Sequence, residues 1–323
     1  MDKCSFSNHI DFKNVHINDD FWSVMQKKVR EKVIPYQYEA LNDKIENAEK
    51  SYCIENFKKA SKVVKAQKND KSLPVYPVDK WHYDESNSDK NAFHGWVFQD
   101  SDAYKWLEAV AYSLATAWDD ELYNRACGLI ELICSAQCDN GYLDTLYIIN
   151  DQSKIFTNLK DFHELYCFGH LAEAGVAFYC STGNKMLLDA ALRFADLICD
   201  VFNENGKRGY PGHEIAELAL VKLYRVTKNA KYLKTAEFFI NERGTKPFYF
   251  DKERNIKTDG SDYVYNQAHM PVREQSEAVG HAVRGVYLYS GMADVAKEVN
   301  DENLYTACKR IWNNITKKKM YNR

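Results

Sequence analysis

Residues 179–194 read YCSTGNKMLLDAALRF and decide the fold, because the pattern returns 45 positions later in residues 224–239, YRVTKNAKYLKTAEFF. The Thr-x-Asn step that starts at Thr182, and again at Thr227, is typical of a tight turn between helices. Residues 304–307 repeat the Leu-x-x-Ala core of both copies. Repeated helix–turn–helix units predict an all-α solenoid or a closed helical toroid.

The two helices of a repeat differ in character. Residues 165–180 are apolar on nearly every side and rich in Gly and Ala, whereas residues 186–202 have one charged face. A helix of the first kind is buried all round, and one of the second kind has one face in solvent. An inner ring of buried helices inside an outer amphipathic ring favours the toroid.

The rest of the chain is less regular. Ser101 is the expected N-cap of a helix whose apolar stripe runs from Ala103 to Trp118, and a second helix buries Leu122, Ala126, Leu129, Ile130 and Ile133. We expect an initial helix over about 20–42 that bends near Pro35, and a short helix over about 56–64. Residues 139–161 are expected to form a loop, and residues 244–271 a loop with a short hairpin around Tyr249 and Tyr263.

Composition excludes several classes of protein. The 323 residues carry 43 basic and 46 acidic side chains, a net charge of −3, which argues against a nucleic-acid partner. No apolar run is long enough for a membrane span, and the N-terminus does not resemble a signal peptide. The nine scattered cysteines are typical of reduced thiols in a cytoplasmic protein. Cys134 and Cys138 lie one turn apart, but no further ligand pair stands near them in the sequence, so a shared metal is not favoured.

Polar residues gather where inner helices are expected to begin. His94 with Gln99 and Asp100 precedes one such helix, and His163, His213 and His281 precede others. The starts of inner helices open onto one end of a toroid, so these side chains are expected to converge on one pocket. The alternative for each histidine is a structural role, as a helix cap or as a partner of a buried backbone group.

Aromatic and acidic residues are further candidates for sugar contacts and for catalysis, but the sequence does not select among them. Trp96, Phe98 and Tyr142 are expected to pack in the core or to stack on a sugar ring. Two carboxylates that flank a glycosidic bond are the signature of most glycosidases. Helix starts favour acidic residues in any case, and spacing does not select a pair from the candidates Asp100, Asp102, Asp144, Glu164, Glu214, Glu274 and Glu277.

Several long motifs in order give a family resemblance. They include HGWVFQDSDAYKW (94–106), DNGYLDT (139–145), HELY (163–166), GYPGHEI (209–215), PVREQ (271–275) and GHAVR (280–284). On these the chain resembles the N-terminal part of glycoside hydrolase family 127, the β-L-arabinofuranosidases. The resemblance implies an (α/α)6 barrel in which His163, His213 and His281 hydrogen-bond the hydroxyls of an L-arabinofuranoside-like sugar. We add His94, Gln99, Asp100 and Asp144 as further expected sugar-binding residues.

The catalytic group of the family is not found in this sequence. The resemblance implies a retaining mechanism with a zinc-bound cysteine thiolate as nucleophile, a Glu in Gly-Glu-x-Phe as acid/base, and zinc ligands in Glu-x-Cys and Cys-Cys. None of these motifs occurs in residues 1–323. We therefore expect no catalytic residue, metal or cofactor in this chain. We expect residues 1–323 to be a single toroid domain of about four to five helix pairs, truncated before the ring closes. We also expect the family's C-terminal β domains to be absent. Such a domain is expected to be inactive unless a C-terminal partner or downstream segment completes it.

Two alternatives from other functional classes remain open. The chain can be a non-catalytic carbohydrate-binding or scaffold protein that kept the pocket. It can also be a toroid glycosidase or lyase of a different kind, in which two carboxylates such as Asp100 and Asp144 perform the chemistry without zinc.

Overall fold

The computed structural model describes residues 10–69, 72–254 and 260–320. Contacts divide these residues into two compact units. The N-terminal unit contains the described residues up to 155 together with 170–194, and the C-terminal unit contains 156–169 together with the described residues from 195 onward. Helices dominate both units, so the prediction of an all-α fold is confirmed. Two predictions depend on how the two units are arranged: that the helices form a toroid, and that residues 1–323 form a single domain. Both stay predictions.

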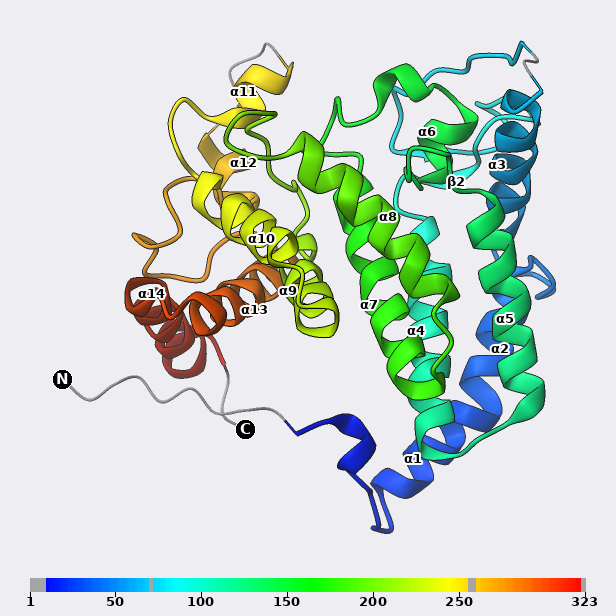
Figure 1. Cartoon of the computed structure of the whole chain (residues 1–323), viewed down its shortest axis with the longest axis horizontal. Coiled ribbons are helices and arrows are strands. Elements are labelled where there is room, and N and C mark those ends of the chain that lie inside the picture. Colours follow the sequence, from blue (N-terminus) through cyan, green and yellow to red (C-terminus); the bar gives the residue numbers. More distant parts are fainter. Residues whose placement is uncertain (1–9, 70–71, 255–259, 321–323) are drawn as a thin grey trace. The chain divides into compact units, whose positions relative to one another are not determined.

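The N-terminal unit packs α2, α3 and α5 against α4, whose apolar stripe from Ala103 to Leu114 is buried (Figure 1). The indole Nε1 of Trp106 on α4 donates a hydrogen bond to the carbonyl oxygen of Ile34 on α2, at 2.9 Å. The unit's elements are η1 (Phe12–Asn14), α1 (Trp22–Lys28), η2 (Val29–Val33), α2 (Ile34–Leu41), α3 (Cys53–Gln67), β1 (His82–Tyr83), β2 (Gly95–Trp96), α4 (Asp100–Thr116), α5 (Asp120–Ser135), α6 (Thr145–Ile149) and η3 (Gln152–Lys154).

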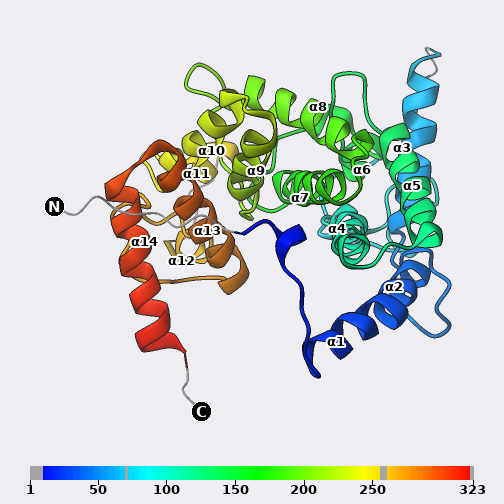
Figure 2. The same cartoon turned by 60° about the horizontal axis from the view of Figure 1, so that its bottom comes forward.

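The C-terminal unit packs α9 against α10 and α13, and α13 against α14 (Figure 2). Gly291 on α13 allows a close approach to α9, because a Cβ at this position would lie 3.0 Å from the Cβ of Glu217. The elements of this unit are α9 (Ala216–Thr227), α10 (Ala230–Glu242), α11 (Tyr249–Arg254), α12 (Gly260–Tyr265), α13 (Ala282–Val299), α14 (Glu302–Asn314) and η4 (Ile315–Lys319).

The repeated turn is confirmed in hydrogen-bond detail. It joins α7 (Glu164–Thr182) to α8 (Met186–Val201), two helices that pass from one unit into the other, and it also joins α9 to α10. In both copies the Thr hydroxyl donates to the carbonyl four residues earlier at 2.7 Å, and it accepts from the Asn backbone N–H at 3.1–3.2 Å. The Asn side chain then accepts from the N–H two residues later. The shared Thr-x-Asn sequence therefore ends one helix and starts the next.

The predicted initial helix is confirmed with an irregular centre. It consists of α1 and α2 joined by the π-helical turn η2, directly before Ile34 and Pro35. Pro35 has no N–H to donate to the preceding turn, and this explains why the regular α pattern is interrupted there. The helix expected over 56–64 is longer, and the loop expected over 139–161 contains α6 and η3.

Three other expectations are wrong. Residues 244–271 contain no hairpin among those described; Tyr249 and Tyr263 lie on the short helices α11 and α12, which are joined by a 2.8 Å bond from the Tyr263 hydroxyl to Asp251. Ser101 is not an N-cap, because α4 begins at Asp100 and the Ser101 hydroxyl accepts from Lys105. Trp118 does not belong to the buried stripe, because α4 ends at Thr116 and Trp118 is 54% exposed.

Candidate functional site

Three histidines lie side by side in the C-terminal unit, each at the start of a helix. His163 directly precedes α7, His213 lies three residues before α9, and His281 is the N-cap of α13. The ring centroids of His163 and His213 are 5.4 Å apart, and those of His213 and His281 are 5.8 Å apart. The structure therefore brings together three residues that are separated by as many as 118 positions in the sequence.

Tyrosines surround this histidine cluster. The ring of Tyr166, on the first turn of α7, lies 4.4 Å from the ring of His213, and Tyr287 on α13 lies 6.2 Å from it. Tyr265 at the end of α12 packs edge-on against His281 at 5.4 Å. The sequence analysis gave these tyrosines no role. The signal for Tyr166 was its place three residues after His163, in the same HELY motif.

The backbone fixes which ring nitrogen of each histidine carries the proton. His163 Nδ1 lies 2.6 Å from the carbonyl oxygen of Asp161, and His213 Nδ1 lies 3.0 Å from that of Glu214, so both Nδ1 atoms donate. His281 Nδ1 instead accepts from the backbone N–H of Arg284 at 3.3 Å. In the neutral form His163 and His213 therefore have an acceptor at Nε2, whereas His281 has a donor there.

Burial keeps His213 and His281 neutral. Removal from water lowers the pKa of His213 to about 2, and the backbone carbonyl of Glu214 only partly opposes this shift. Burial also lowers the pKa of His281, and the nearby charge of Arg284 adds to the effect. Neutral imidazoles that offer both donors and acceptors match the hydroxyl groups of a sugar, each of which donates one hydrogen bond and accepts others.

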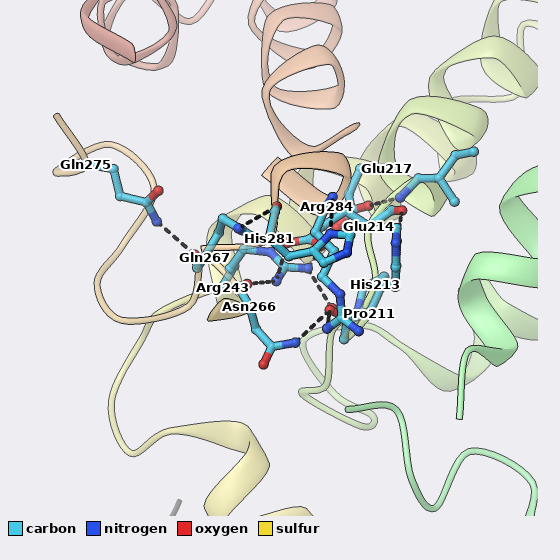
Figure 3. A network of polar contacts seen from close by, with 12 residues as sticks. Pro211, His213, Glu214, Glu217, Arg243, Asn266, Gln267, Gln275, His281 and Arg284 are labelled. Carbon is cyan, nitrogen blue, oxygen red and sulfur yellow. Dashed lines mark hydrogen bonds and ion pairs between the residues drawn. The ribbon is translucent and has the colours of Figure 1, made fainter. Parts of the chain in front are cut away.

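A buried network of charged side chains lies beside His213 (Figure 3). Arg243 Nη1 lies 2.8 Å from Glu214 Oε1, and its Nη2 lies 3.2 Å from Glu217 Oε1; all three side chains are completely buried. Burial raises the pKa of Glu214 to about 8, and the charge of Arg243 opposes that shift. The buried Arg284 adds a second guanidinium, whose charge also opposes the raised pKa of Glu214.

The same network holds the turn that carries His213. Arg243 Nη2 donates to the carbonyl of Pro211 at 2.6 Å, and both Arg284 Nη1 and Asn266 Nδ2 donate to the carbonyl of Gly212 at 2.9 Å (Figure 3). Gly212 has no space for a side chain, because a Cβ would lie 2.1 Å from the carbonyl oxygen of Lys160. This explains the Gly-His pair of the sequence motif: the glycine lets two backbone segments touch, and the arginines fix the position of the histidine.

The segment before His281 is held in a similar way. Gln267 Nε2 donates to the carbonyl of Val279 at 2.7 Å and to that of His281 at 3.1 Å. Gly280 has a φ of 75°, and a Cβ there would lie 2.2 Å from the carbonyl oxygen of Val264. Only glycine fits this turn without strain.

The other four predicted sugar-binding residues lie in the N-terminal unit. Lys59 Nζ lies 3.0 Å from His94 Nδ1, and Gln99 Nε2 donates to Asp102 at 2.8 Å. Asp100 accepts from the backbone N–H of Thr145 at 2.7 Å and from its hydroxyl at 2.5 Å. Asp144 is the N-cap of α6. Contacts of this kind organise the backbone; a sugar-binding role for these four residues stays a prediction.

The remaining candidates have different environments. Tyr142 is completely buried against Phe194, which confirms the core-packing alternative for it, whereas Trp96 is 42% exposed and stacks on Phe98. Glu164 accepts from the backbone N–H of Phe156. Glu274 and Glu277 are exposed.

The described residues do not form a zinc site. No three His, Cys, Asp or Glu side chains converge on a point that can hold a metal within the described ranges. Burial raises the pKa of the thiols of Cys134, Cys138, Cys199 and Cys308 to about 11, which disfavours the thiolate that zinc binds. No described helix combines the length and hydrophobicity that crossing a bilayer requires.

Comparisons with known proteins agree with the sequence motifs. A non-reducing end β-L-arabinofuranosidase of Bifidobacterium longum subsp. longum is 37% identical over 335 aligned positions, which cover 95% of this chain and 47% of that protein. The crystal structure of a GH127 β-L-arabinofuranosidase from Geobacillus stearothermophilus T6 is 47% identical, with a TM-score of 0.84, over 95% of this chain and 46% of that one. A second structure, of the GH127 β-arabinofuranosidase BT3674, is 34% identical, with a TM-score of 0.76, over 96% and 44% of the two chains.

The chain thus spans about half the length of the relatives that it matches. The family model for the catalytic domain of GH127 β-L-arabinofuranosidases matches residues 14–322. Since this match covers nearly the whole sequence, the chain belongs to glycoside hydrolase family 127.

Proposed function

We propose that the chain supplies the sugar-recognition part of a GH127 catalytic domain, and that the histidine cluster binds a terminal β-L-arabinofuranosyl residue. The observation that carries the proposal is the convergence of His163, His213 and His281 with complementary Nε2 donors and acceptors. Tyr166 and Tyr287 beside the cluster offer ring faces for the carbon side of a sugar.

Hydrolysis belongs, in this proposal, to a larger assembly. The motifs expected for the acid/base and for the zinc-bound thiolate are missing from residues 1–323, and the described cysteines do not converge with other ligands. The relatives are about twice as long as the matched segment. The nucleophile, the acid/base and the zinc ligands are therefore supplied by residues outside this chain, in a partner or in a longer polypeptide.

An exposed apolar face supports a contact with such a segment. Val286 on α13 is 57% exposed and Trp312 on α14 is 66% exposed, and both line a groove of about 420 Å³ between the two helices. Tyr289, Ile311 and Ile315 contribute to its apolar lining. Exposed apolar grooves of this kind mark interaction surfaces. We assign this groove to a contact with the part of a GH127 protein that lies outside the matched segment.

The test is sugar binding by the 323-residue chain. Methyl β-L-arabinofuranoside is titrated by calorimetry and by saturation-transfer NMR, and saturable binding is expected. The His213→Ala variant is expected to weaken binding about tenfold or more, which corresponds to about 1.4 kcal/mol. The His16→Ala variant, which changes an exposed histidine, is the matched control and retains binding.

An activity assay separates the parts of the proposal. The chain alone, with or without zinc, is expected to leave p-nitrophenyl β-L-arabinofuranoside intact. Zinc-dependent turnover by the chain alone would contradict the assignment of catalysis to an outside segment. Zinc-independent turnover that is lost in Asp144→Asn would instead favour the two-carboxylate alternative. Absence of any sugar binding would overturn the proposed role of the histidine cluster.

A further inference from the structure

The N-terminal unit contains a polar cavity that the proposed function does not use. Its volume is about 490 Å³, and it lies between the segment that precedes α3, α3 itself and residues 85–94. Among its lining residues are Lys50, Tyr52, Lys59, Glu85, Lys90 and His94.

The lining includes a half-buried ammonium group whose partners are neutral. Lys59 Nζ donates to the carbonyl oxygen of Ala92 at 2.7 Å and lies 3.0 Å from His94 Nδ1. Within the described residues Lys59 has no ion-pair partner. Burial lowers the pKa of Lys59, and the charges of Glu55 and Asp89 partly restore it. Two of its three N–H groups are used, so one remains to donate to a ligand.

His94 adds a second donor. The carbonyl of Ala92 also lies 3.0 Å from His94 Nδ1, but the ammonium of Lys59 has no acceptor, so Nδ1 must accept from Lys59. One arrangement satisfies all three groups: Lys59 donates to both the carbonyl and Nδ1, and the imidazole proton is on Nε2. Burial and the adjacent Lys59 charge lower the pKa of His94, so the ring is neutral and donates from Nε2.

Two residues of the cavity wall have strained backbone. Asp43 and Tyr52 both have positive φ, at 57° and 56°. The Asp43 carboxylate accepts from the N–H groups of Ser51 at 2.6 Å and Tyr52 at 3.2 Å, which fixes the tyrosine at the start of α3. The Tyr52 ring packs 5.1 Å from the His94 ring. Backbone strain of this kind persists where the surrounding structure holds it, and it is common at ligand-binding sites.

The charges of the cavity do not cancel locally. Glu85 is paired with Lys50 at 2.6 Å and also accepts from the Tyr52 hydroxyl, and Glu55 is paired with Lys58 at 3.7 Å. The carboxylate of Asp43 is engaged by backbone amides. Lys59 and the exposed Lys90 are left without an ion-pair partner among the described residues. Two cations and a neutral N–H donor thus face one small cavity.

We propose that this cavity is a binding site for a small oxyanion, a phosphate or carboxylate group, held by Lys59 and Lys90 with the Nε2–H of His94. Both anions present the negatively charged oxygens that ammonium and imidazole donors bind. Inorganic phosphate has two more oxygens than acetate and carries more charge at neutral pH, so the two anions differ in the number of donors that they can engage.

The experiment uses the 323-residue chain with inorganic phosphate or acetate as the probe, at constant ionic strength set with sodium chloride. Binding is measured by calorimetry, together with the rate at which an amine-reactive reagent labels Lys59, read by peptide mass spectrometry. One of the anions is expected to bind saturably and to slow Lys59 labelling at least threefold at saturation. The anion that does so decides whether the ligand is phosphorylated or carboxylated.

Two variants make the test specific. Lys59→Met keeps the aliphatic stem and is expected to abolish saturable binding. Lys65→Met removes the same charge from an exposed position on the same helix and is expected to retain it. If Lys59→Met does not fold, Lys90→Met at an exposed position takes its place, with affinity reduced at least threefold. Absence of saturable binding by either anion, or equal binding by wild type and the cavity variant, overturns the proposal.

Discussion

The guanidinium of Arg243 lies 2.8 Å from the carboxylate of Glu214, the residue that directly follows His213, and both side chains are completely buried. Arg243 also donates to the carbonyl of Pro211, two residues before His213. A charged pair at this place therefore fixes the backbone on both sides of the histidine. Breaking a buried pair is costly because the remaining partner loses its compensating charge.

We predict that Arg243→Met destabilises the chain by about 3–5 kcal/mol, measured by urea unfolding. The matched control is Arg125→Met, which removes a guanidinium 2.9 Å from Glu121, a carboxylate with 84% of its side chain exposed. An ion pair in solvent contributes about 1 kcal/mol or less, so the control is expected to lose no more than that. Equal losses in the two variants would show that the buried pair has no special role.

Replacement of Gly212 is predicted to disrupt the site through the backbone. A Cβ at this position would lie 2.1 Å from the carbonyl oxygen of Lys160, so Gly212→Ala must separate two segments next to His213. We expect a loss of more than about 2 kcal/mol in stability and a loss of sugar binding. Gly128→Ala on α5 is the control, because nothing lies within 4 Å of its Cβ and alanine favours the helix by about 1 kcal/mol. A stable, sugar-binding Gly212→Ala variant would contradict the close approach of Gly212 to Lys160.

The pH dependence of stability follows from His213. Burial lowers its folded-state pKa to about 2, whereas an unfolded histidine titrates near about 6.5. Below that pH the unfolded chain binds a proton that the folded chain excludes. The contribution of His213 to stability is therefore present above about pH 6.5 and falls by about 1.4 kcal/mol per unit at lower pH.

The measurement is urea unfolding between about pH 5 and pH 7.5. His213→Phe is expected to have a flatter dependence on pH than the wild type, since the side chain no longer titrates. His16→Phe changes an exposed histidine and is expected to keep the wild-type slope. An unchanged slope in His213→Phe would show that His213 binds protons equally in the folded and the unfolded chain.

The sequence predicted those features that depend on local pattern. The Thr-x-Asn turns at Thr182 and Thr227 contain their own hydrogen-bonding partners, so a single copy is enough to identify the turn. The histidines at the starts of helices were found because they interrupt apolar sequence. The Asp251–Tyr263 contact joins two short helices across residues 252–262, and no periodic pattern signals it.

The charged network could not be predicted for a similar reason. Arg243 and Glu214 are 29 positions apart, and each is an ordinary residue in its own segment. Their pairing depends on how α9 packs against α10 and α13, which hydrophobic spacing alone does not specify. Arg284 belongs to the motif at residues 280–284, but its contact with the Gly212 carbonyl appears only in three dimensions.

The apolar groove between α13 and α14 is predicted to be a contact surface. The double variant Val286→Asp, Trp312→Glu places two charges on side chains that are 57% and 66% exposed, so the chain alone is expected to keep its melting temperature. If the groove packs against the remainder of a GH127 catalytic domain, the same charges are buried without partners in the complex. Each unpaired buried charge costs several kcal/mol, which is enough to prevent association.

This chain is co-expressed with the portion of the Geobacillus relative that follows the matched region. Association is measured by size-exclusion chromatography, and zinc-dependent turnover is the second readout. The wild-type chain is expected to co-elute and to gain activity, and the double variant to do neither. Val75→Asp changes an equally exposed apolar residue in the N-terminal unit and is expected to behave as the wild type. Sugar binding by the double variant alone is expected to persist, because the histidine cluster lies at the starts of the helices, outside the residues that line the groove. A double variant that still restores turnover would assign the groove to some other contact and leave the sugar-binding proposal intact.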